Sequence, residues 1–323
     1  MTRASGEPAV RTWFIGEGPF AALCLERLYP LLKADGFRLE RVITGQPTRS
    51  GRGMKETPSP VEQCAARLLC DVERTGRLSQ NEALRERLRD SPPDVIFVVD
   101  FGQLVREPFL SAPRWGCLNI HPSLLPLWRG AAPIQRALMN GDAETGVTVF
   151  RLASEMDAGP VLRQAAVPVG PDAGASELFR TLSALGAEIA AEGLRALAAG
   201  TGSFTEQEHA HATCAAKLAR EEFAVSWADP ALKAHNLVRA LDMSGGAYVP
   251  LLGKRLKLWR THLTERRGTP GHILSLEPEG PVAAFGDGVG LRLDEVQAEG
   301  KRRTGGAEWA RGMRLSAGGG LEV

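Results

Sequence analysis

Short apolar runs alternate with amphipathic stretches over the first 200 or so residues of the chain. Runs rich in branched residues predict strands, and apolar positions that recur every three or four residues predict helices. The run at residues 94–99 is apolar on both faces, as in the centre of a parallel sheet. Further strands are expected at residues 10–15, 37–44, 146–152 and 160–169, and helices at residues 20–32, 60–69, 79–88, 131–139 and 175–199. This alternation predicts an α/β, Rossmann-like domain with a predominantly parallel sheet.

The pattern changes after Gly200-Thr201-Gly202-Ser203, which has the composition of a linker. A helix is expected at residues 230–241. Strand-length pieces then alternate with Gly and Pro, at residues 247–252, 255–259, 271–276, 281–285 and 289–296. Five short strands are typical of a small barrel such as an OB-fold. We therefore predict a catalytic domain over residues 1–203 and a smaller, OB-like β-barrel domain over residues 204–323.

Composition adds limits to this picture. The 323 residues suit about two domains, and the 43% hydrophobic content is ordinary for a globular protein. The net charge of +1 by itself predicts no polyanionic partner. Residues 41–55 and 233–267 are locally basic, and such clusters can contact phosphates, although one cluster alone is more often a solvated face.

The five cysteines show no zinc-site spacing, so reduced thiols in a cytoplasmic protein are the simplest interpretation. No apolar run reaches the ~20 residues of a membrane span. The N-terminus lacks the apolar core of a signal peptide. We expect a cytoplasmic monomer without a metal site or a membrane partner.

Candidate chemistry is concentrated between residues 116 and 159. Cys117, Leu118 and Ile120 predict a short buried strand that Pro122 ends. Positions i and i+2 of a strand share a face, so Asn119 and His121 project together at its carboxyl end. Ligands bind at that edge of open α/β sheets.

Each signal is weak when taken alone. An Asn-x-His triplet is usually a strand end with a satisfied histidine, and an Asp before Ala-Gly, as at Asp157, is usually a turn residue. A proline-bounded turn follows the triplet, and Arg129-Gly130-Ala131-Ala132-Pro133 opens a helix. Together these features favour a functional site.

These residues resemble the folate-dependent formyltransferase family. Asn119-x-His121, Ser123-Leu124-Leu125-Pro126 and Asp157 fit the family as a whole. The runs from Arg129 to Arg136 and from Gly141 to Thr148 are more specific to its tRNA-formylating members. The resemblance covers residues 14 to about 261.

The resemblance implies transfer of a formyl group from N10 of 10-formyltetrahydrofolate to an amine, with no metal. Asn119 would then donate a hydrogen bond to the oxyanion of a tetrahedral intermediate. His121 would either donate a second bond or accept the amine's proton, and Asp157 would orient His121 or relay the proton through water. The implied folate pocket includes Phe20, for which a core position is an equal alternative, and the loop residues Ser123, Leu124, Leu125 and Pro126.

The resemblance also implies initiator methionyl-tRNA as the partner. Residues 45–60 show no periodicity, and loops of that length are usually functional or disordered. In the tRNA-formylating members an insertion at this place contacts the acceptor stem. The resemblance therefore predicts that Arg52, with Arg49 and Lys55, contacts tRNA phosphates. A flexible loop with scattered charge is the simpler alternative.

Two departures from the family pattern leave alternatives open. Asp100 replaces a small apolar residue near the folate crevice, where a charge could alter pterin contacts or His121 protonation. Met243-Ser244-Gly245 stands where a Pro-Trp-Pro segment is expected, which bears on the tRNA-facing domain. The missing Pro-Trp-Pro and the near-neutral net charge leave an amino-sugar nucleotide or another small amine as an alternative acceptor. A non-catalytic RNA-binding protein is a further alternative, against which the intact Asn119, His121 and Asp157 argue.

Overall fold

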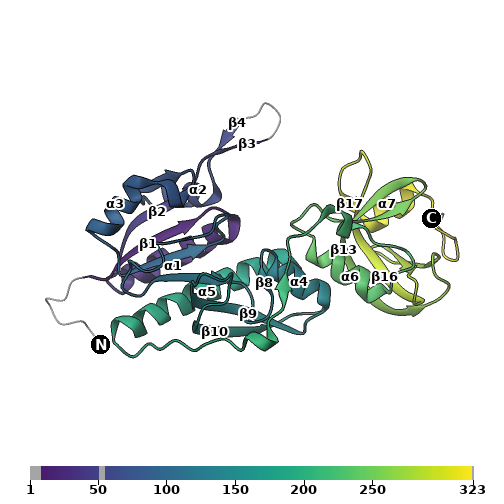
Figure 1. Ribbon diagram of the computed structural model, residues 1–323. Coiled ribbons are helices and arrows are strands. Elements are labelled where there is room, and N and C mark those ends of the chain that lie inside the picture. Colours follow the sequence, from purple (N-terminus) through teal and green to yellow (C-terminus); the bar gives the residue numbers. More distant parts are fainter. Residues whose placement is uncertain (1–8, 51–54, 322–323) are drawn as a thin grey trace. The chain divides into compact units, whose positions relative to one another are not determined.

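The computed structural model describes residues 9–50 and 55–321, and for residues 49, 50 and 55 the backbone alone (Figure 1). Its contacts divide the chain into two compact units. The first comprises Met1–Gly130, Gly146–Val167 and Phe179–Cys214, and the second comprises Ala131–Thr145, Pro168–Leu178 and Ala215–Val323. The second unit thus includes two segments from within the predicted catalytic domain, residues 1–203, as well as the C-terminal part. The expected boundary at residue 203 stays a prediction.

A seven-stranded sheet forms the centre of the first unit, in the order β10-β9-β7-β6-β1-β2-β5. Strands β5, β2, β1, β6 and β7 run parallel, whereas β9 is antiparallel to β7. The predicted α/β class with a predominantly parallel sheet is confirmed. The strands are β1 (Arg11–Gly16), β2 (Arg38–Gly45), β5 (Val72–Thr75), β6 (Val95–Val99), β7 (Cys117–His121), β9 (Glu144–Arg151) and β10 (Val161–Pro168).

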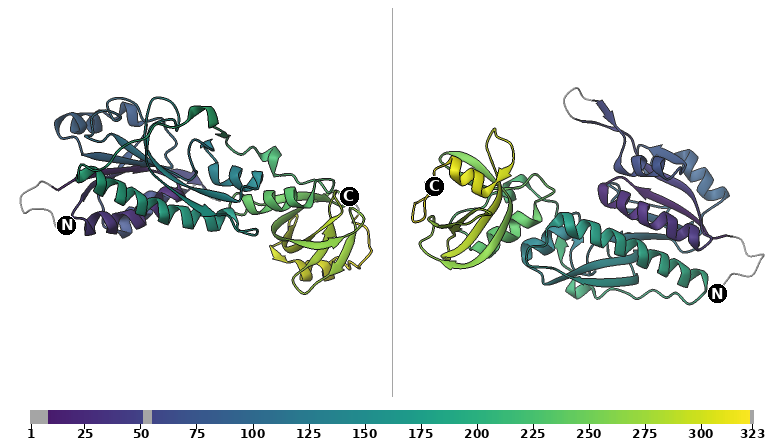
Figure 2. Two further views of the ribbon diagram at one scale, coloured as in Figure 1. Left: turned by 90° about the horizontal axis from the view of Figure 1, so that it is seen from below. Right: turned by 180° about the vertical axis from the view of Figure 1, so that it is seen from behind.

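Helices flank this sheet (Figures 1 and 2). They are α1 (Pro19–Ala34), α2 (Pro60–Arg67), α3 (Glu82–Asp90) and α5 (Ala175–Ala198), with a short 3-10 turn η1 (Leu78–Gln80) before α3. The apolar face of α3 packs with β1 and β6, in one cluster that holds Leu84, Leu88, Ile15 and Ile96. Helices α1 and α5 pack together, with the rings of Phe20 and Phe179 edge to face at 5.3 Å.

The long segment without periodicity is more ordered than predicted. Strands β3 (Thr48–Ser50) and β4 (Lys55–Thr57) pair antiparallel within it, and α2 begins directly after it, capped by Ser59. These strands are too short for a sequence periodicity to reveal. Arg52 lies outside the described residues, and so do the side chains of Arg49 and Lys55. The three predicted phosphate contacts therefore stay predictions.

The second unit is built on an all-antiparallel sheet in the order β12-β13-β16-β15-β14, and β17 pairs with β16. All five predicted strands are present. Strand β13 is 14 residues long, because its pairing with β16 continues past Trp259 through three register shifts, among mostly polar residues. The strands are β12 (Ala247–Leu251), β13 (Lys254–Arg267), β14 (Ile273–Leu276), β15 (Pro281–Ala284), β16 (Val289–Ala298) and β17 (Thr304–Gly305).

Three helices complete this unit: α4 (Pro133–Asn140), α6 (Ala231–Ala240) and α7 (Gly306–Gly312). Its core gathers apolar side chains of α6 and of the sheet, among them Val238, Leu258, Phe285 and Leu293. The remaining short elements are β8 (Arg129–Gly130), which pairs with β11 (Cys214–Ala215), and the 3-10 turns η2 (His209–His211) and η3 (Arg220–Phe223).

Candidate active site

Strand β7 places Asn119 and His121 at its carboxyl end, as predicted. Its parallel register with β6 pairs Val98 with Asn119, so both strands end at the same edge of the sheet. The alternate residue Ile120 packs against Gly186 of α5, which leaves Asn119 and His121 on the opposite face. Asn119 is half-buried, and no residue in the described ranges hydrogen-bonds to its side chain. Its amide is thus available to a ligand.

His121 is held in one orientation. Its ring is buried, and Nε2 lies 3.0 Å from the backbone oxygen of Trp128. A carbonyl oxygen only accepts hydrogen bonds, so Nε2 carries a proton and Nδ1 is the remaining reactive nitrogen. Nδ1 lies 3.8 Å from Oδ2 of Asp157. The fold therefore brings together the imidazole and the carboxylate that lie far apart in the sequence.

Asp157 lies on a backbone turn of unusual geometry. Its φ of 51° is in the left-handed region, which non-glycine residues rarely adopt. Oδ2 accepts a hydrogen bond of 2.8 Å from the backbone N–H of Gly130. Left-handed residues of this kind persist where surrounding contacts fix them, and they cluster at functional sites.

The loop from Ser123 to Pro126 is fixed by buried hydrogen bonds. The Ser123 hydroxyl is buried and donates to the backbone oxygen of Leu127 at 2.6 Å, which suits a role in shaping the loop. Thr148 Oγ1 donates to Ser123 O at 2.7 Å and accepts from Leu125 N at 3.0 Å. Gln164 Nε2 donates to Leu125 O and to Thr148 Oγ1. Sequence reasoning did not identify Thr148 or Gln164 as supports of this loop.

Two further contacts bear on the predicted folate pocket. A Cβ atom at Gly146 would lie 2.4 Å from Leu124 Cδ2, so the glycine admits the leucine side chain against β9. Leu125 is buried, whereas Leu124 and Pro126 are partly exposed. Phe20 is buried against Phe179, which favours its core alternative. The contacts of Phe20, Ser123, Leu124, Leu125 and Pro126 with folate stay predictions.

Asp100 lies at the same sheet edge, directly after β6. Its backbone oxygen accepts bonds from Glu17 N and Gly18 N, and its carboxylate accepts one from Phe20 N at 3.3 Å. Burial raises the pKa of the Asp100 carboxyl group, and the N–H groups of Phe20 and Ala21 oppose that rise. The residue that departs from the family pattern thus contacts the first turn of α1.

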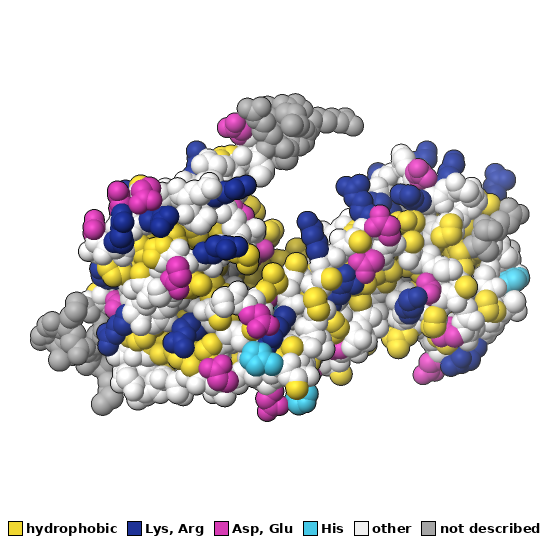
Figure 3. All heavy atoms as spheres, viewed as in Figure 1, with side chains coloured by type: hydrophobic (Ala, Val, Ile, Leu, Met, Phe, Trp, Pro, Cys, Tyr) yellow, Lys and Arg dark blue, Asp and Glu magenta, His cyan; other side chains and the backbone are white. Residues whose placement is uncertain are grey.

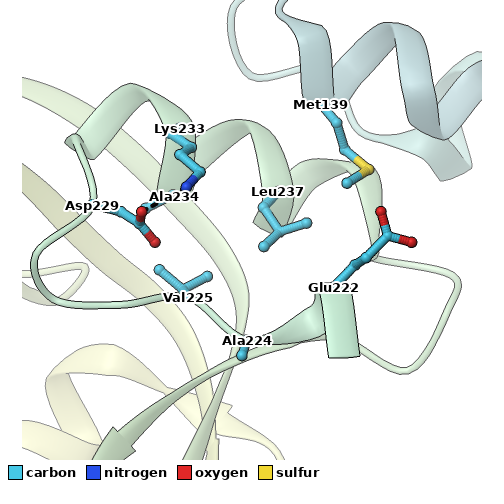
Figure 4. Close-up of a pocket in the computed structure, with 8 residues that line it drawn as sticks. All are labelled: Met139, Glu222, Ala224, Val225, Asp229, Lys233, Ala234 and Leu237. Atoms are coloured by element: carbon cyan, nitrogen blue, oxygen red, sulfur yellow. Dashed lines mark hydrogen bonds and ion pairs between the residues drawn. The ribbon is translucent and has the colours of Figure 1, made fainter. Parts of the chain in front are cut away.

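A separate pocket of about 280 Å³ lies in the second unit (Figure 4). Five of its eight lining residues are apolar, and the charged ones have partners: Lys233 pairs with Asp229 at 2.7 Å, and Glu222 pairs with Arg136 at 2.6 Å. None of the residues predicted for catalysis or folate binding lines it. Its lining consists of Met139, Glu222, Ala224, Val225, Asp229, Lys233, Ala234 and Leu237.

Within residues 9–50 and 55–321, no cluster of His, Cys, Asp and Glu side chains is arranged to hold a metal ion. The same residues contain no helix that is long and apolar enough to cross a membrane.

Comparison with known protein families covers most of the chain. Residues 17–194 match the formyl transferase model, and residues 217–314 match the model of the formyl transferase C-terminal domain.

Comparison with individual proteins gives the same picture. The methionyl-tRNA formyltransferase of Roseiflexus castenholzii is 40% identical over 96% of this chain and 98% of its own length. The enzyme of the same name from Aromatoleum aromaticum is 39% identical over 94% of this chain and 95% of its own length.

Solved structures of lower identity share the fold. HypX from Aquifex aeolicus, in complex with tetrahydrofolic acid, aligns with a TM-score of 0.65 at 20% identity, over 96% of this chain. The chain spans 48% of HypX, about half its length. An N-formyltransferase from Helicobacter canadensis, in complex with folinic acid and dTDP-3-aminofucose, aligns with a TM-score of 0.63 at 16% identity. That alignment covers 88% of this chain and 99% of the neighbour.

Proposed function

The chain belongs to the formyl transferase family, and we propose that it transfers the formyl group of 10-formyltetrahydrofolate to the α-amino group of methionyl initiator tRNA. The carrying observation is the convergence of Asn119, His121 and Asp157 at one sheet edge, in a chain 40% identical to a curated methionyl-tRNA formyltransferase along its length. The product, formylmethionyl-tRNA, serves translation initiation.

The proposed reaction begins when the free amine attacks the formyl carbon and a C–N bond forms. The formyl oxygen becomes an oxyanion, and a preorganised donor aimed at that charge is often the largest catalytic contribution. The Asn119 side-chain amide is suited to this role because it is half-buried at the strand end with no hydrogen-bond partner among the described residues. Collapse of the intermediate then breaks the bond from carbon to N10.

A proton must leave the attacking amine and reach N10. His121 can accept it only at Nδ1, because Nε2 already donates to Trp128 O. A proton on Nδ1 faces the Asp157 carboxylate 3.8 Å away, which would stabilise the imidazolium. An aminoacyl α-amine has a pKa of roughly 8 or below by analogy with chain termini, so a strong base is not required.

Binding roles follow from the same proposal. The loop Ser123, Leu124, Leu125 and Pro126 would form a wall for the folate, shaped by Thr148 and Gln164. Arg52, with Arg49 and Lys55, would contact tRNA phosphates, and the C-terminal β domain would contribute further contacts. A cytoplasmic, monomeric protein is the expectation that accompanies these substrates.

An amino-sugar nucleotide as acceptor is less well supported. The Helicobacter canadensis enzyme that was solved with dTDP-3-aminofucose is 16% identical to this chain, which supports a shared fold and no shared substrate. The relatives at about 40% identity align over nearly the whole chain, and both are named methionyl-tRNA formyltransferase.

Single-turnover formylation tests the proposal. Enzyme loaded with 10-formyltetrahydrofolate would be offered methionyl initiator tRNA or a panel of amino-sugar nucleotides. We expect formylmethionyl-tRNA, and we expect His121→Ala or Asp157→Ala to slow its formation by about 10²–10⁴-fold, the usual contribution of general acid–base groups. Transfer only to a sugar amine would overturn the acceptor, and unchanged rates in both variants would overturn the assigned residues.

A further inference from the structure

Gln207 lies beside the Asp157 turn, although the two residues are far apart in the sequence. An antiparallel bridge pairs Val161, at the start of β10, with Thr205. That register sets residue 207 opposite residue 159. Gln207 is 6% exposed, so its amide is removed from water and needs protein partners.

Every hydrogen-bonding position of this amide is used. Nε2 donates to the backbone oxygen of Asp157 at 2.9 Å and to that of Gly159 at 2.7 Å. Oε1 accepts from Nη2 and Nε of Arg129 at 2.7 and 3.2 Å. A buried polar network in which every group is satisfied rigidifies its surroundings.

These bonds fix both the backbone of Asp157 and the segment that donates a hydrogen bond to its carboxylate. On one side Gln207 fixes the backbone of Asp157, whose left-handed φ of 51° needs outside support. On the other side it fixes Arg129, and the next residue, Gly130, donates its N–H to Asp157 Oδ2. Gly159 belongs to the same arrangement, because a Cβ there would lie 1.8 Å from Arg151 O.

We propose that Gln207 is a positioning residue for the formyl transfer, which sets the Asp157 carboxylate against His121 Nδ1 by tying the Asp157 turn to Arg129. The inference rests on the proposed function, because it supposes that His121 accepts the amine's proton and that the Asp157 carboxylate stabilises the resulting imidazolium. Gln207 itself contacts neither reacting group. Its effect passes through Asp157, and misplacing a catalytic group by ~1 Å can cost about 10²-fold in rate.

Two substitutions separate the parts of this network. Gln207→Leu removes all four hydrogen bonds. Gln207→Glu retains acceptors for Arg129 but sets a carboxylate oxygen against the carbonyls of Asp157 and Gly159, where the donor is needed. We expect both variants to lower kcat by about 10–100-fold, with the KM values for 10-formyltetrahydrofolate and methionyl-tRNA changed by less than about threefold.

Gln103→Leu is the matched control. Gln103 also bridges backbone groups of the first unit, accepting from Leu78 N at 2.9 Å and donating to Gly76 O at 2.7 Å, but away from the Asp157 turn. We expect Gln103→Leu to lower the melting temperature while kcat is kept. A kcat loss as large in Gln103→Leu as in Gln207→Leu would reduce Gln207 to general structural support and overturn the proposal.

A second readout does not need turnover. NMR chemical shifts of the His121 ring at one fixed pH report the groups that surround the ring, among them the Asp157 carboxylate 3.8 Å from Nδ1. We expect these shifts to change in Gln207→Leu in the same direction as in Asp157→Asn. Wild-type protein inactive on methionyl-tRNA would count against the proposed function. Active wild-type protein, with kcat and the His121 chemical shifts both unchanged in Gln207→Leu, would count against the role of Gln207.

Discussion

Asn119 is the residue whose side chain has the most direct predicted contact with the transition state. We expect Asn119→Ala to lower kcat by about 10²–10³-fold, as for loss of one oxyanion donor elsewhere. KM should change little, because the oxyanion exists only in the transition state. Single-turnover rates at saturating donor and tRNA would measure this. A variant with raised KM values and an unchanged kcat would instead assign Asn119 to ground-state binding.

Asp100 offers a test of charge at the same sheet edge. Its pKa is raised by burial, so the folded protein holds the proton more tightly than the unfolded chain does. Stability should therefore fall as the pH rises from the ordinary Asp pKa, about 3.9, through the raised value. Asp100→Asn removes this loss and retains an acceptor for Phe20 N.

The measurement is the melting temperature of Asp100→Asn minus that of the wild type, from pH 3 to pH 7. We expect this difference to increase with pH and then level off. A difference that stays flat or becomes more negative would contradict the account. Donor KM values of the same variant would show whether the charge also affects folate binding, the question that the sequence left open.

Single residues were predictable where local chemistry marked them. Asn119 and His121 follow from a strand's two-residue period and from the proline that ends the strand. Trp128 and Gln207 carried no such signal, because one acts through its carbonyl group and the other meets Asp157 only through a distant strand pairing. Phe20 shows the converse difficulty, because aromatic residues beside a glycine turn occur in pockets and in cores alike.

Strand β9 supports the loop from Ser123 to Pro126, and Thr148 provides a test of that support. Its buried hydroxyl is bonded to Ser123 O, Leu125 N and Gln164 Nε2. Thr148→Val keeps the shape but removes the bonds of the hydroxyl to Ser123 O and Leu125 N, and each buried unpaired group costs about 1–3 kcal/mol. We expect urea denaturation to show that the free energy of unfolding falls by about 1–3 kcal/mol or more. We also expect a raised KM for the folate donor.

Thr145 of the same strand is the matched control. It is equally buried, and its hydroxyl makes no hydrogen bond among the described residues. Thr145→Val should therefore change the unfolding free energy by less than about 0.5 kcal/mol, which is ordinary for a substitution away from such features. Equal losses in the two variants would show that the hydroxyl bonds of Thr148 do not support the loop.

Elements with long periodic patterns were predicted closely, and polar connections between elements were not. The helix expected at residues 175–199 is α5, which ends one residue earlier. Its first turn is capped by a residue far away in the sequence, because the Asp242 carboxylate accepts hydrogen bonds from the backbone N–H and the hydroxyl group of Ser176. Buried Arg239 of α6 likewise bonds to Gly170 O and Ala173 O. Such bonds join segments some 66 residues apart, and a local pattern cannot indicate them.

At the scale of the whole chain, the net charge of +1 conceals an uneven distribution. Lys and Arg side chains gather over the upper side of the C-terminal part in Figure 3. On strand β13, Arg255 lies over the ring of Tyr248 at 4.6 Å and Lys257 over that of Trp259 at 5.5 Å. Neither cation forms an ion pair with a described residue. Lys257 Nζ donates to Gly245 O at 2.8 Å and keeps further N–H groups for a phosphate.

Salt dependence distinguishes a phosphate-binding face from a solvated one. Each phosphate contact contributes about 0.9 to the slope of log Kd against log salt on double-stranded nucleic acid, and about 0.7 on single strands. We therefore expect Arg255→Ala and Lys257→Ala each to reduce the slope for methionyl-tRNA binding by nearly one. Arg266→Ala, on the same strand, should leave it unchanged, because Glu277 already pairs with Arg266 at 2.9 Å. Equal slopes in all three variants would mean that this face is solvated, and that the phosphate contacts lie elsewhere, with Arg52 the next residue to test.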